Sequence, residues 1–305
     1  MSHIFDALQR AESESTGTES PTFSVATELL QAAERKMRET PTMSEPHTSA
    51  DSFDSTPSTS SLVDLERCPI LSVSIPEESH LVSVGQEESL GAEKFRFLAV
   101  RLRQLRQSRP LKKILITSSI PQEGKSMVAA NLACTLARRK RQKTLLLEGD
   151  LRRPTVAAEF GLGRIPGLCE WLSGQTKGIN LYRLESLGLW VLPAGAAPQN
   201  PLELMQCGRL SPFMDKLQGW FDWIVIDSPP VLPLADTSVW SRLADGILLV
   251  TRKGTTEKQQ LQRGLEAIEK SKLLGALVNS SSNAAHSDYY ERYGYTSSPV
   301  DQSKE

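Results

Sequence analysis

One stretch of the chain reads Ser119-Ile-Pro-Gln-Glu-Gly-Lys-Ser126, after the apolar run Ile114-Leu-Ile-Thr117 and before a helical pattern that begins at Met127. This order of strand, loop and helix predicts a loop that binds phosphates, because backbone N–H groups and the positive end of the helix dipole would point at the anion. Lys125 would contact the β- and γ-phosphates of a nucleotide, and the Ser126 hydroxyl would bind Mg²⁺. The residues expected to surround the nucleotide here are Gln122, Glu123, Gly124, Lys125, Ser126 and Met127.

Further apolar runs, rich in Val, Ile and Leu, alternate with helical patterns along the chain. Strands are predicted at residues 114–118, 144–148, 190–192, 223–227, 246–250 and 274–279, and helices at residues 88–106, 124–139, 201–217, 235–243 and 256–272. Such alternation is typical of a mainly parallel sheet covered by helices on both faces. We therefore predict an α/β fold of the P-loop NTPase type, in which ligands bind beyond the carboxyl ends of the strands.

Acidic side chains follow two of these predicted strands. Asp227 ends an apolar run and precedes Ser-Pro-Pro, so we expect its carboxylate to hold Mg²⁺ beside Ser126; the alternative is that it caps a strand–loop junction. Glu148 and Asp150 lie two residues apart and point the same way from an extended segment. We expect this pair to orient a metal ligand or to accept a proton from an attacking hydroxyl, the alternative being a solvated turn.

Three other polar residues, Arg152, Arg153 and Asn279, are candidates for the same site. Arg152 and Arg153 follow the acidic pair, and their guanidinium groups would either stabilise charge on a transferred phosphate or neutralise the neighbouring acids. Asn279 ends the last predicted strand, where its amide could recognise the edge of adenine. Asp236 begins a predicted helix and is interpreted as its N-cap or as a group behind the site.

The two ends of the chain differ in composition from the middle. Ser, Thr, Glu and Pro dominate residues 12–61, and such a segment cannot bury enough apolar surface to offset its ordering entropy. We predict that residues 1–80 form a largely disordered tail with short helical segments, transient or docking, at residues 2–8 and 26–37. Residues 81–285 are expected to form the folded domain.

The last segment, residues 286–305, is expected to be a flexible tail rich in tyrosine. Four of the five tyrosines of the chain fall within seven residues of one another near this end. They are Tyr289, Tyr290, Tyr293 and Tyr295. Their surroundings have no apolar periodicity, so they lie outside the predicted core.

The bulk composition limits the location and the partners of the protein. The net charge of −1 provides no general attraction to nucleic acid, so no nucleic-acid partner is expected. The four cysteines form no Cys-x-x-Cys pair, which favours reduced thiols over a disulfide frame or a zinc site. No apolar run approaches the roughly 20 residues that span a bilayer. We therefore expect a cytoplasmic protein, for which any membrane association would most simply come through a partner.

Taken together, these residues resemble the bacterial tyrosine kinases (BY-kinases) of exopolysaccharide and capsule chain-length systems. Those proteins are similar to P-loop ATPases of the MinD/ParA group. The resemblance covers roughly residues 82–295. It is carried by Pro121-Gln-Glu-Gly-Lys-Ser126 as Walker A, Leu145-Leu-Leu-Glu-Gly-Asp-Leu-Arg-Arg-Pro154 as Walker A′, Ile224-Val-Ile-Asp-Ser-Pro-Pro230 as Walker B, and the terminal tyrosines.

The resemblance implies an ATP-dependent protein tyrosine autokinase that regulates exopolysaccharide or capsule biosynthesis and export. By this resemblance, Lys125 and Ser126 bind ATP and Mg²⁺, and Asp150 and Asp227 serve the metal and the acceptor tyrosine. The implied autophosphorylation sites are the four terminal tyrosines. The implied partner is a membrane-anchored chain-length adaptor whose cytoplasmic tail activates the kinase.

Three positions depart from the family pattern. Glu148 stands where the family usually has Asp, which retains the charge but changes the reach of the side chain. Ala99 replaces the second Arg of the oligomerisation pattern Glu-x-x-Arg-x-x-Arg that begins at Glu93, which weakens the case for a ring while self-association remains expected. Ile120 stands where MinD/ParA ATPases have a lysine, which favours the kinase branch.

Two alternatives to a kinase are considered. One is a positioning ATPase that hydrolyses ATP without phosphorylating protein. The other is a non-catalytic, nucleotide-dependent scaffold.

Overall fold

The computed structural model describes residues 65, 68–76, 79–86, 88–139 and 141–280. The helical segments predicted at residues 2–8 and 26–37 lie outside the described residues. So do the four tyrosines of the C-terminal tail, Tyr289, Tyr290, Tyr293 and Tyr295.

The described residues fold around a seven-stranded sheet with the order β3-β4-β2-β5-β1-β6-β7. Its strands are β1 (Lys113–Ser118), β2 (Thr144–Glu148), β3 (Tyr182–Leu184), β4 (Leu189–Leu192), β5 (Trp223–Asp227), β6 (Gly246–Arg252) and β7 (Leu273–Asn279). Neighbouring strands are parallel except β3, which is antiparallel to β4. The predicted α/β fold with a mainly parallel sheet is confirmed; β3, three residues long, was too short to be predicted from an apolar run.

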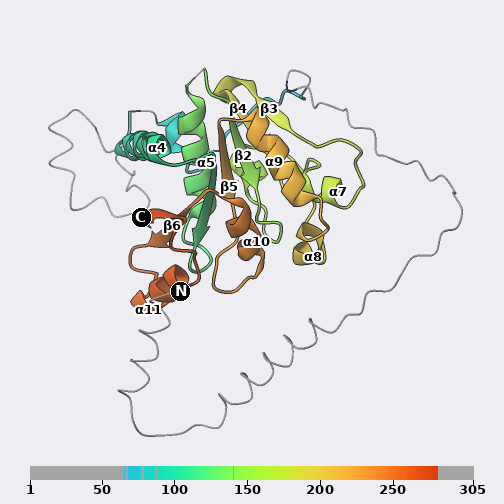
Figure 1. Ribbon diagram of the computed structural model, residues 1–305. Helices are drawn as coiled ribbons and strands as arrows, with labels where there is room; N and C mark the ends of the chain where they lie inside the picture. Colours follow the sequence, from blue (N-terminus) through green and yellow to red (C-terminus); the bar gives the residue numbers. More distant parts are fainter. Residues whose placement is uncertain (1–64, 66–67, 77–78, 87, 140, 281–305) are drawn as a thin grey trace, which may run out of the picture. The chain divides into compact units, whose positions relative to one another are not determined.

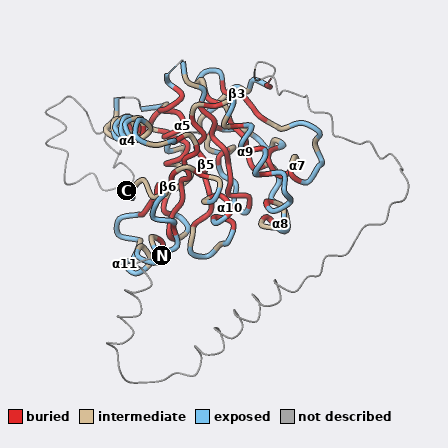
Figure 2. The backbone as a smooth tube through the Cα atoms, viewed as in Figure 1, coloured by how far each residue is buried: buried red, intermediate tan, exposed pale blue. Residues whose placement is uncertain are grey.

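Helices cover both faces of the sheet, as Figure 1 shows. Their bounds are α3 (Val82–Gly85), α4 (Leu90–Ser108), α5 (Lys125–Ala137), α6 (Val156–Glu159), α7 (Leu168–Leu172), α8 (Pro201–Met205), α9 (Leu210–Trp220), α10 (Asp236–Leu243) and α11 (Lys258–Glu266), with a short 3₁₀ turn at Glu185–Leu187. Helices α3, α4 and α5 pack on one face, while α7, α8, α9 and α10 contribute to the core on the other. The two cores are separated by the sheet, whose central strands are buried on both faces (Figure 2).

The register of the central strands brings the acidic residues to one edge. Asp227 at the end of β5 lies opposite Ile116 of β1 on one side and Glu148 of β2 on the other. Because these strands are parallel, their carboxyl ends meet at the same edge of the sheet. The phosphate loop follows β1 at this edge, so the fold itself brings the loop and both acidic segments together.

Two helices differ from their predicted bounds. The single helix predicted over residues 201–217 is two helices, α8 and α9, and Gly208 between them has a left-handed backbone (φ 80°) that a continuous helix cannot contain. The helix predicted over residues 256–272 ends at Glu266, because the chain must turn before β7 begins. Apolar periodicity continues across both breaks, so it does not reveal them.

Among the residues that the structure describes, no helix is both long and apolar enough to cross a membrane. All four cysteines, Cys68, Cys134, Cys169 and Cys207, are free thiols.

The position of Ala99 in α4 yields a prediction. Ala99 has no exposed surface and packs in the core beneath α4, whereas its neighbour Val100 is 48% exposed. Ala99→Arg would force a guanidinium group into this core, so we expect it to lower the free energy of unfolding by about 3 kcal/mol. Val100→Arg is the matched control and should leave the thermal unfolding curve nearly unchanged. Equal melting temperatures for the two variants would contradict this packing of α4.

Candidate active site

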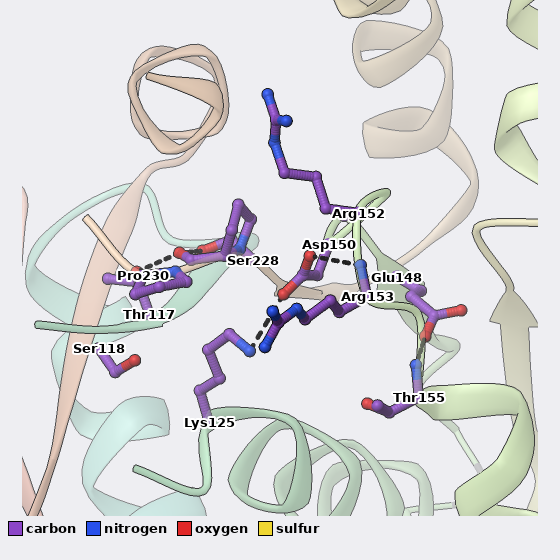
Figure 3. Close-up of polar contacts among 12 residues, drawn as sticks. Thr117, Ser118, Lys125, Glu148, Asp150, Arg152, Arg153, Thr155, Ser228 and Pro230 are labelled. Atoms are coloured by element: carbon purple, nitrogen blue, oxygen red, sulfur yellow. Dashed lines mark hydrogen bonds and ion pairs between the residues drawn. The ribbon is translucent and has the colours of Figure 1, made fainter. Parts of the chain in front are cut away.

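The phosphate loop joins β1 to α5 and contains a glycine, Gly124, with a left-handed backbone. Gly124 adopts φ 87°, and a Cβ atom added there would lie 2.3 Å from Nδ2 of Asn279. The left-handed backbone therefore disfavours any residue with a Cβ atom, and such an atom would also displace the Asn279 amide. Lys125 begins α5 directly after this glycine, and its Nζ lies 3.1 Å from Oδ2 of Asp150 (Figure 3).

Asp227 is the most strongly perturbed acid of the site. It is fully buried at the end of β5, and among the described residues neither carboxylate oxygen makes a hydrogen bond of ordinary geometry, although the Ser126 hydroxyl lies near enough to lower its pKa. Burial raises the pKa of Asp227 to about 7; the charge of Lys125 and then the Ser126 hydroxyl oppose this rise, and the nearby carboxylates of Glu148 and Asp150 reinforce it. A buried carboxylate of this kind fits a divalent cation, which would supply the missing positive charge. The Ser126 hydroxyl is the second group of the chain suited to the same ion.

Asp150 lies on the other side of Lys125. Its Oδ1 accepts a hydrogen bond from the backbone N–H of Arg153 at 3.1 Å, while Oδ2 faces Lys125. The carboxylate is therefore held by its own loop and paired with the lysine of the phosphate loop. Asp150 and Asp227, predicted from two separate motifs, both interact electrostatically with Lys125.

Glu148 is oriented differently from the other two acids. Its fully buried carboxylate accepts hydrogen bonds from the backbone N–H groups of Thr155, Val156 (2.6 Å) and Ala194 (2.9 Å). In Figure 3 it points toward Thr155 and away from Lys125. Burial raises the pKa of Glu148, and these three N–H groups oppose the rise. The carboxylate that we expected to work on substrate or metal instead ties the start of α6 to the loop after β4.

The side chains of Arg152 and Arg153, in the loop after β2, also point in different directions. Nε and Nη2 of Arg152 donate to the buried carboxylate of Asp236 at 2.6 and 3.1 Å, which fastens the loop to the first residue of α10. Arg153 makes no side-chain hydrogen bond or ion pair within the described residues, and in Figure 3 it extends toward Lys125 while Arg152 points away. Of the two, Arg153 is the guanidinium available to a phosphate.

Asn279, predicted to contact adenine, touches the phosphate loop itself. Its Nδ2 donates to the backbone carbonyl of Glu123 at 3.1 Å. The first turn of α5 lies close by, since Met127 Cε is 3.7 Å from the position that a Cβ of Gly124 would take. Asn279 thus packs on the loop from the end of β7, at the edge where the nucleotide is expected.

Several contacts that hold this edge were not predicted. The Thr117 hydroxyl donates to the carbonyl of Pro229 at 2.8 Å, and the Thr237 hydroxyl donates to the same carbonyl at 2.9 Å, which fixes the segment after Asp227 against β1. Such loops usually begin with Gly or Ala, and here Ser119 takes that position. Its side chain has room because the facing residue of α11 is Gly264: a Cβ atom added to Gly264 would lie 2.2 Å from Ser119 Oγ. No local pattern in the sequence signals contacts between such distant residues.

Comparison with known proteins identifies the family. No protein-family model matches the chain. It is 34% identical over 217 residues to the tyrosine-protein kinase YwqD of Bacillus subtilis, an alignment that covers 70% of this chain and 90% of that protein. The chain belongs to the bacterial tyrosine-protein kinases. It is also 32% identical over 199 residues to the tyrosine-protein kinase CpsD of Streptococcus agalactiae, covering 63% of this chain and 86% of that protein.

Solved structures agree with this family. The chimerical protein CapA2B2 superposes with a TM-score of 0.62 at 32% identity, over 70% of this chain and 94% of the other. The kinase domain of the Escherichia coli tyrosine kinase ETK gives a TM-score of 0.61 at 27% identity, over 67% of this chain and 81% of the other. The resemblance stated from the Walker A, A′ and B motifs is therefore confirmed.

The raised pKa of Asp227 makes the stability of the nucleotide-free kinase depend on pH. Between the ordinary value of 3.8 and about 7, the folded chain keeps a proton that the unfolded chain has lost, so stability falls as the pH rises through this window. Asp227→Asn removes the buried charge. We expect it to raise the melting temperature at pH 8 by about 5 °C, with a smaller gain toward pH 5, in thermal unfolding without nucleotide.

The control for this experiment is Asp215→Asn, which changes an exposed carboxylate on α9. It should leave the melting temperature within about 1 °C at both pH values, since surface substitutions have small effects. A gain from Asp227→Asn that is equal at pH 5 and pH 8 would contradict the raised pKa.

The contacts of Glu148 predict a structural role. A Gln side chain has only one acceptor oxygen, so Glu148→Gln should leave at least one of the three backbone N–H groups unsatisfied and cost about 1–3 kcal/mol of stability. Thermal unfolding measures this cost, with Glu88→Gln, which alters an exposed carboxyl group, as the control. A Glu148→Gln variant that melts like the native protein yet loses all kinase activity would instead place its carboxylate in the chemistry.

Proposed function

We propose that this kinase is an ATP-dependent protein tyrosine autokinase. The observation that carries the proposal is the fully buried carboxylate of Asp227 near Lys125 and Ser126 of the phosphate loop, which makes no hydrogen bond of ordinary geometry within the part of the chain that the structure describes. This pair of charges suits a triphosphate with a bound Mg²⁺, because the lysine meets the phosphates and the carboxylate meets the cation. Mg²⁺, when bound, neutralises charge on the phosphates; Asp227 and Ser126 are the residues that hold it, with Asp150 as the third candidate ligand.

The phosphoryl transfer then depends mainly on positioning. Lys125 binds the β- and γ-phosphates and stabilises the negative charge that develops on them. Arg153 reaches the same region from the A′ loop, the part of the Walker A′ motif that follows β2. Asp150 faces Lys125 from the opposite side and orients or deprotonates the attacking tyrosine hydroxyl. Arg152 and Glu148 act indirectly, since their side chains hold the A′ loop to α10 and to the loop after β4.

The phosphate acceptor in this proposal is a tyrosine of the C-terminal tail, from a neighbouring copy of the chain. A cavity of about 910 Å³ opens beside the A′ loop and is bordered by Pro154, Arg164 and Glu170. A space of this size holds several residues of an extended peptide. Phosphorylation adds nearly two negative charges to each tyrosine near pH 7, so a modified tail would be repelled by the acidic site and leave it.

The biological setting follows from the resemblance. We infer regulation of exopolysaccharide or capsule biosynthesis and export, with activation by a membrane-anchored chain-length adaptor. The solved chimera CapA2B2 supports the idea of a partner, since a chimera joins parts of two proteins. In this proposal the kinase is cytoplasmic and reaches the inner membrane through that partner, and it self-associates without requiring a ring.

Incubation with γ-labelled ATP and Mg²⁺ tests the proposed activity. We expect label on the purified kinase, in the presence of the adaptor tail, and loss of at least 90% of it in Lys125→Met, because removing a phosphate-binding lysine typically costs a factor of 10²–10³ in rate. Changing Tyr289, Tyr290, Tyr293 and Tyr295 together to Phe should also abolish the label. This variant retains Tyr182, the remaining tyrosine of the sequence, as an internal control.

Three outcomes would contradict the proposal. Full labelling of the four-site variant would exclude these tyrosines as acceptors. Release of phosphate without any phosphotyrosine would favour a positioning ATPase, and nucleotide binding with neither reaction would favour a scaffold.

A further inference from the structure

Glu123 of the phosphate loop is a fully buried acid whose carboxylate faces the protein. Its Oε2 accepts a hydrogen bond from the backbone N–H of Ile120 at 2.9 Å, which closes the loop on itself. Its Oε1 accepts a hydrogen bond from the hydroxyl of Thr256. Because both oxygens are engaged inside the protein, the Glu123 side chain supports the loop from behind.

Thr256 belongs to the turn between β6 and α11, more than a hundred residues away along the chain. Its Oγ1 also accepts a hydrogen bond from the backbone N–H of Arg252 at 3.0 Å, and its own N–H donates to the Arg252 carbonyl at 3.1 Å. The hydroxyl is thus fixed by the turn on one side and by Glu123 on the other. Arg252 adds a longer contact, from Nη1 to the carbonyl of Gln122 at 3.4 Å.

The loop has a strained residue that these contacts hold in place. Gln122 has φ 64°, a left-handed backbone that costs a residue with a side chain about 1 kcal/mol or more and persists only where the surroundings enforce it. It lies between the two residues, Ile120 and Glu123, that the buried carboxylate joins. A loop whose N–H groups must already point at phosphates loses affinity when it is free to relax.

We propose that Glu123 and Thr256 are positioning residues for nucleotide binding. The Thr256 hydroxyl orients the Glu123 carboxylate, and this carboxylate holds the phosphate loop in the conformation that accepts the triphosphate. The turn between β6 and α11 thereby controls the affinity for ATP without touching the nucleotide. The inference rests on the proposed function, because it assumes that the loop binds the phosphates of ATP.

Thr256→Val tests this inference, since it removes the hydroxyl and keeps the shape of the side chain. Binding of a fluorescent, non-hydrolysable ATP analogue with Mg²⁺ to the full chain should weaken about tenfold, the effect of losing one hydrogen bond to a carboxylate. Thr256→Ser keeps the hydroxyl and should bind within about twofold of the native chain. Thr255→Val, at the exposed neighbouring position, is the matched control and should change nothing.

Kinetics separate positioning from general damage. In autophosphorylation assays, Thr256→Val should raise KM for ATP about tenfold while kcat at saturating ATP stays within about twofold, because the bound loop regains its conformation. A merely structural loss would lower the melting temperature and the active fraction and leave KM unchanged. That outcome would overturn the inference.

A double-mutant cycle tests whether the two residues act as one unit. If Thr256 works through Glu123, the variant with both Glu123→Ala and Thr256→Val should bind the analogue no more weakly than Glu123→Ala alone. Fully multiplicative losses would overturn the inference. A native chain that binds the analogue, together with a Thr256→Val variant of equal affinity, would refute only the inference; a native chain that binds no nucleotide would refute the proposed function as well.

Discussion

The site depends on one partly buried cation, Lys125, facing two buried carboxylates. Lys125 pairs with Asp150 across 3.1 Å and lowers the pKa of Asp227, which burial nevertheless raises to about 7. The charges do not balance without a ligand: within the described residues, the Asp227 carboxylate makes no hydrogen bond of ordinary geometry in a setting that penalises its charge. A site arranged in this way favours a cation bound together with a polyanion over either alone. The segments around it serve mainly to keep these three side chains at fixed separations.

The surrounding polar groups form that support. The Asp236 carboxylate accepts hydrogen bonds from Arg152. The hydroxyls of Thr117 and Thr237 both donate to the Pro229 carbonyl. The Glu148 carboxylate accepts hydrogen bonds from three backbone N–H groups. Each of these buried groups has a hydrogen-bond partner, which offsets part of the cost of burying it. Their combined effect is to connect the A′ loop and the segment after β5 to the rigid ends of the strands. Loops with such anchors position catalytic groups more accurately than free loops do.

Much of this could be predicted from local patterns. The buried strands stand out because each is a continuous apolar run, and Lys125, Asp150 and Asp227 stand out because each follows such a run. The direction of a side chain at the end of a strand was harder to predict: Glu148 and Asp150 are two residues apart, yet one carboxylate turns to backbone amides and the other to Lys125. The break at Gly208 and the pairing of Thr256 with Glu123 depend on tertiary contacts that no window of sequence contains.

The edge strand β7 has a consequence for the dynamics of the site. It hydrogen-bonds to a single neighbour, β6, and most of its residues are only partly buried, so its local unfolding costs less free energy than that of the central strands. Its last residue, Asn279, packs on Gly124 and donates to the Glu123 carbonyl. Fraying of the sheet at this edge would therefore reach the phosphate loop while the central strands remain intact.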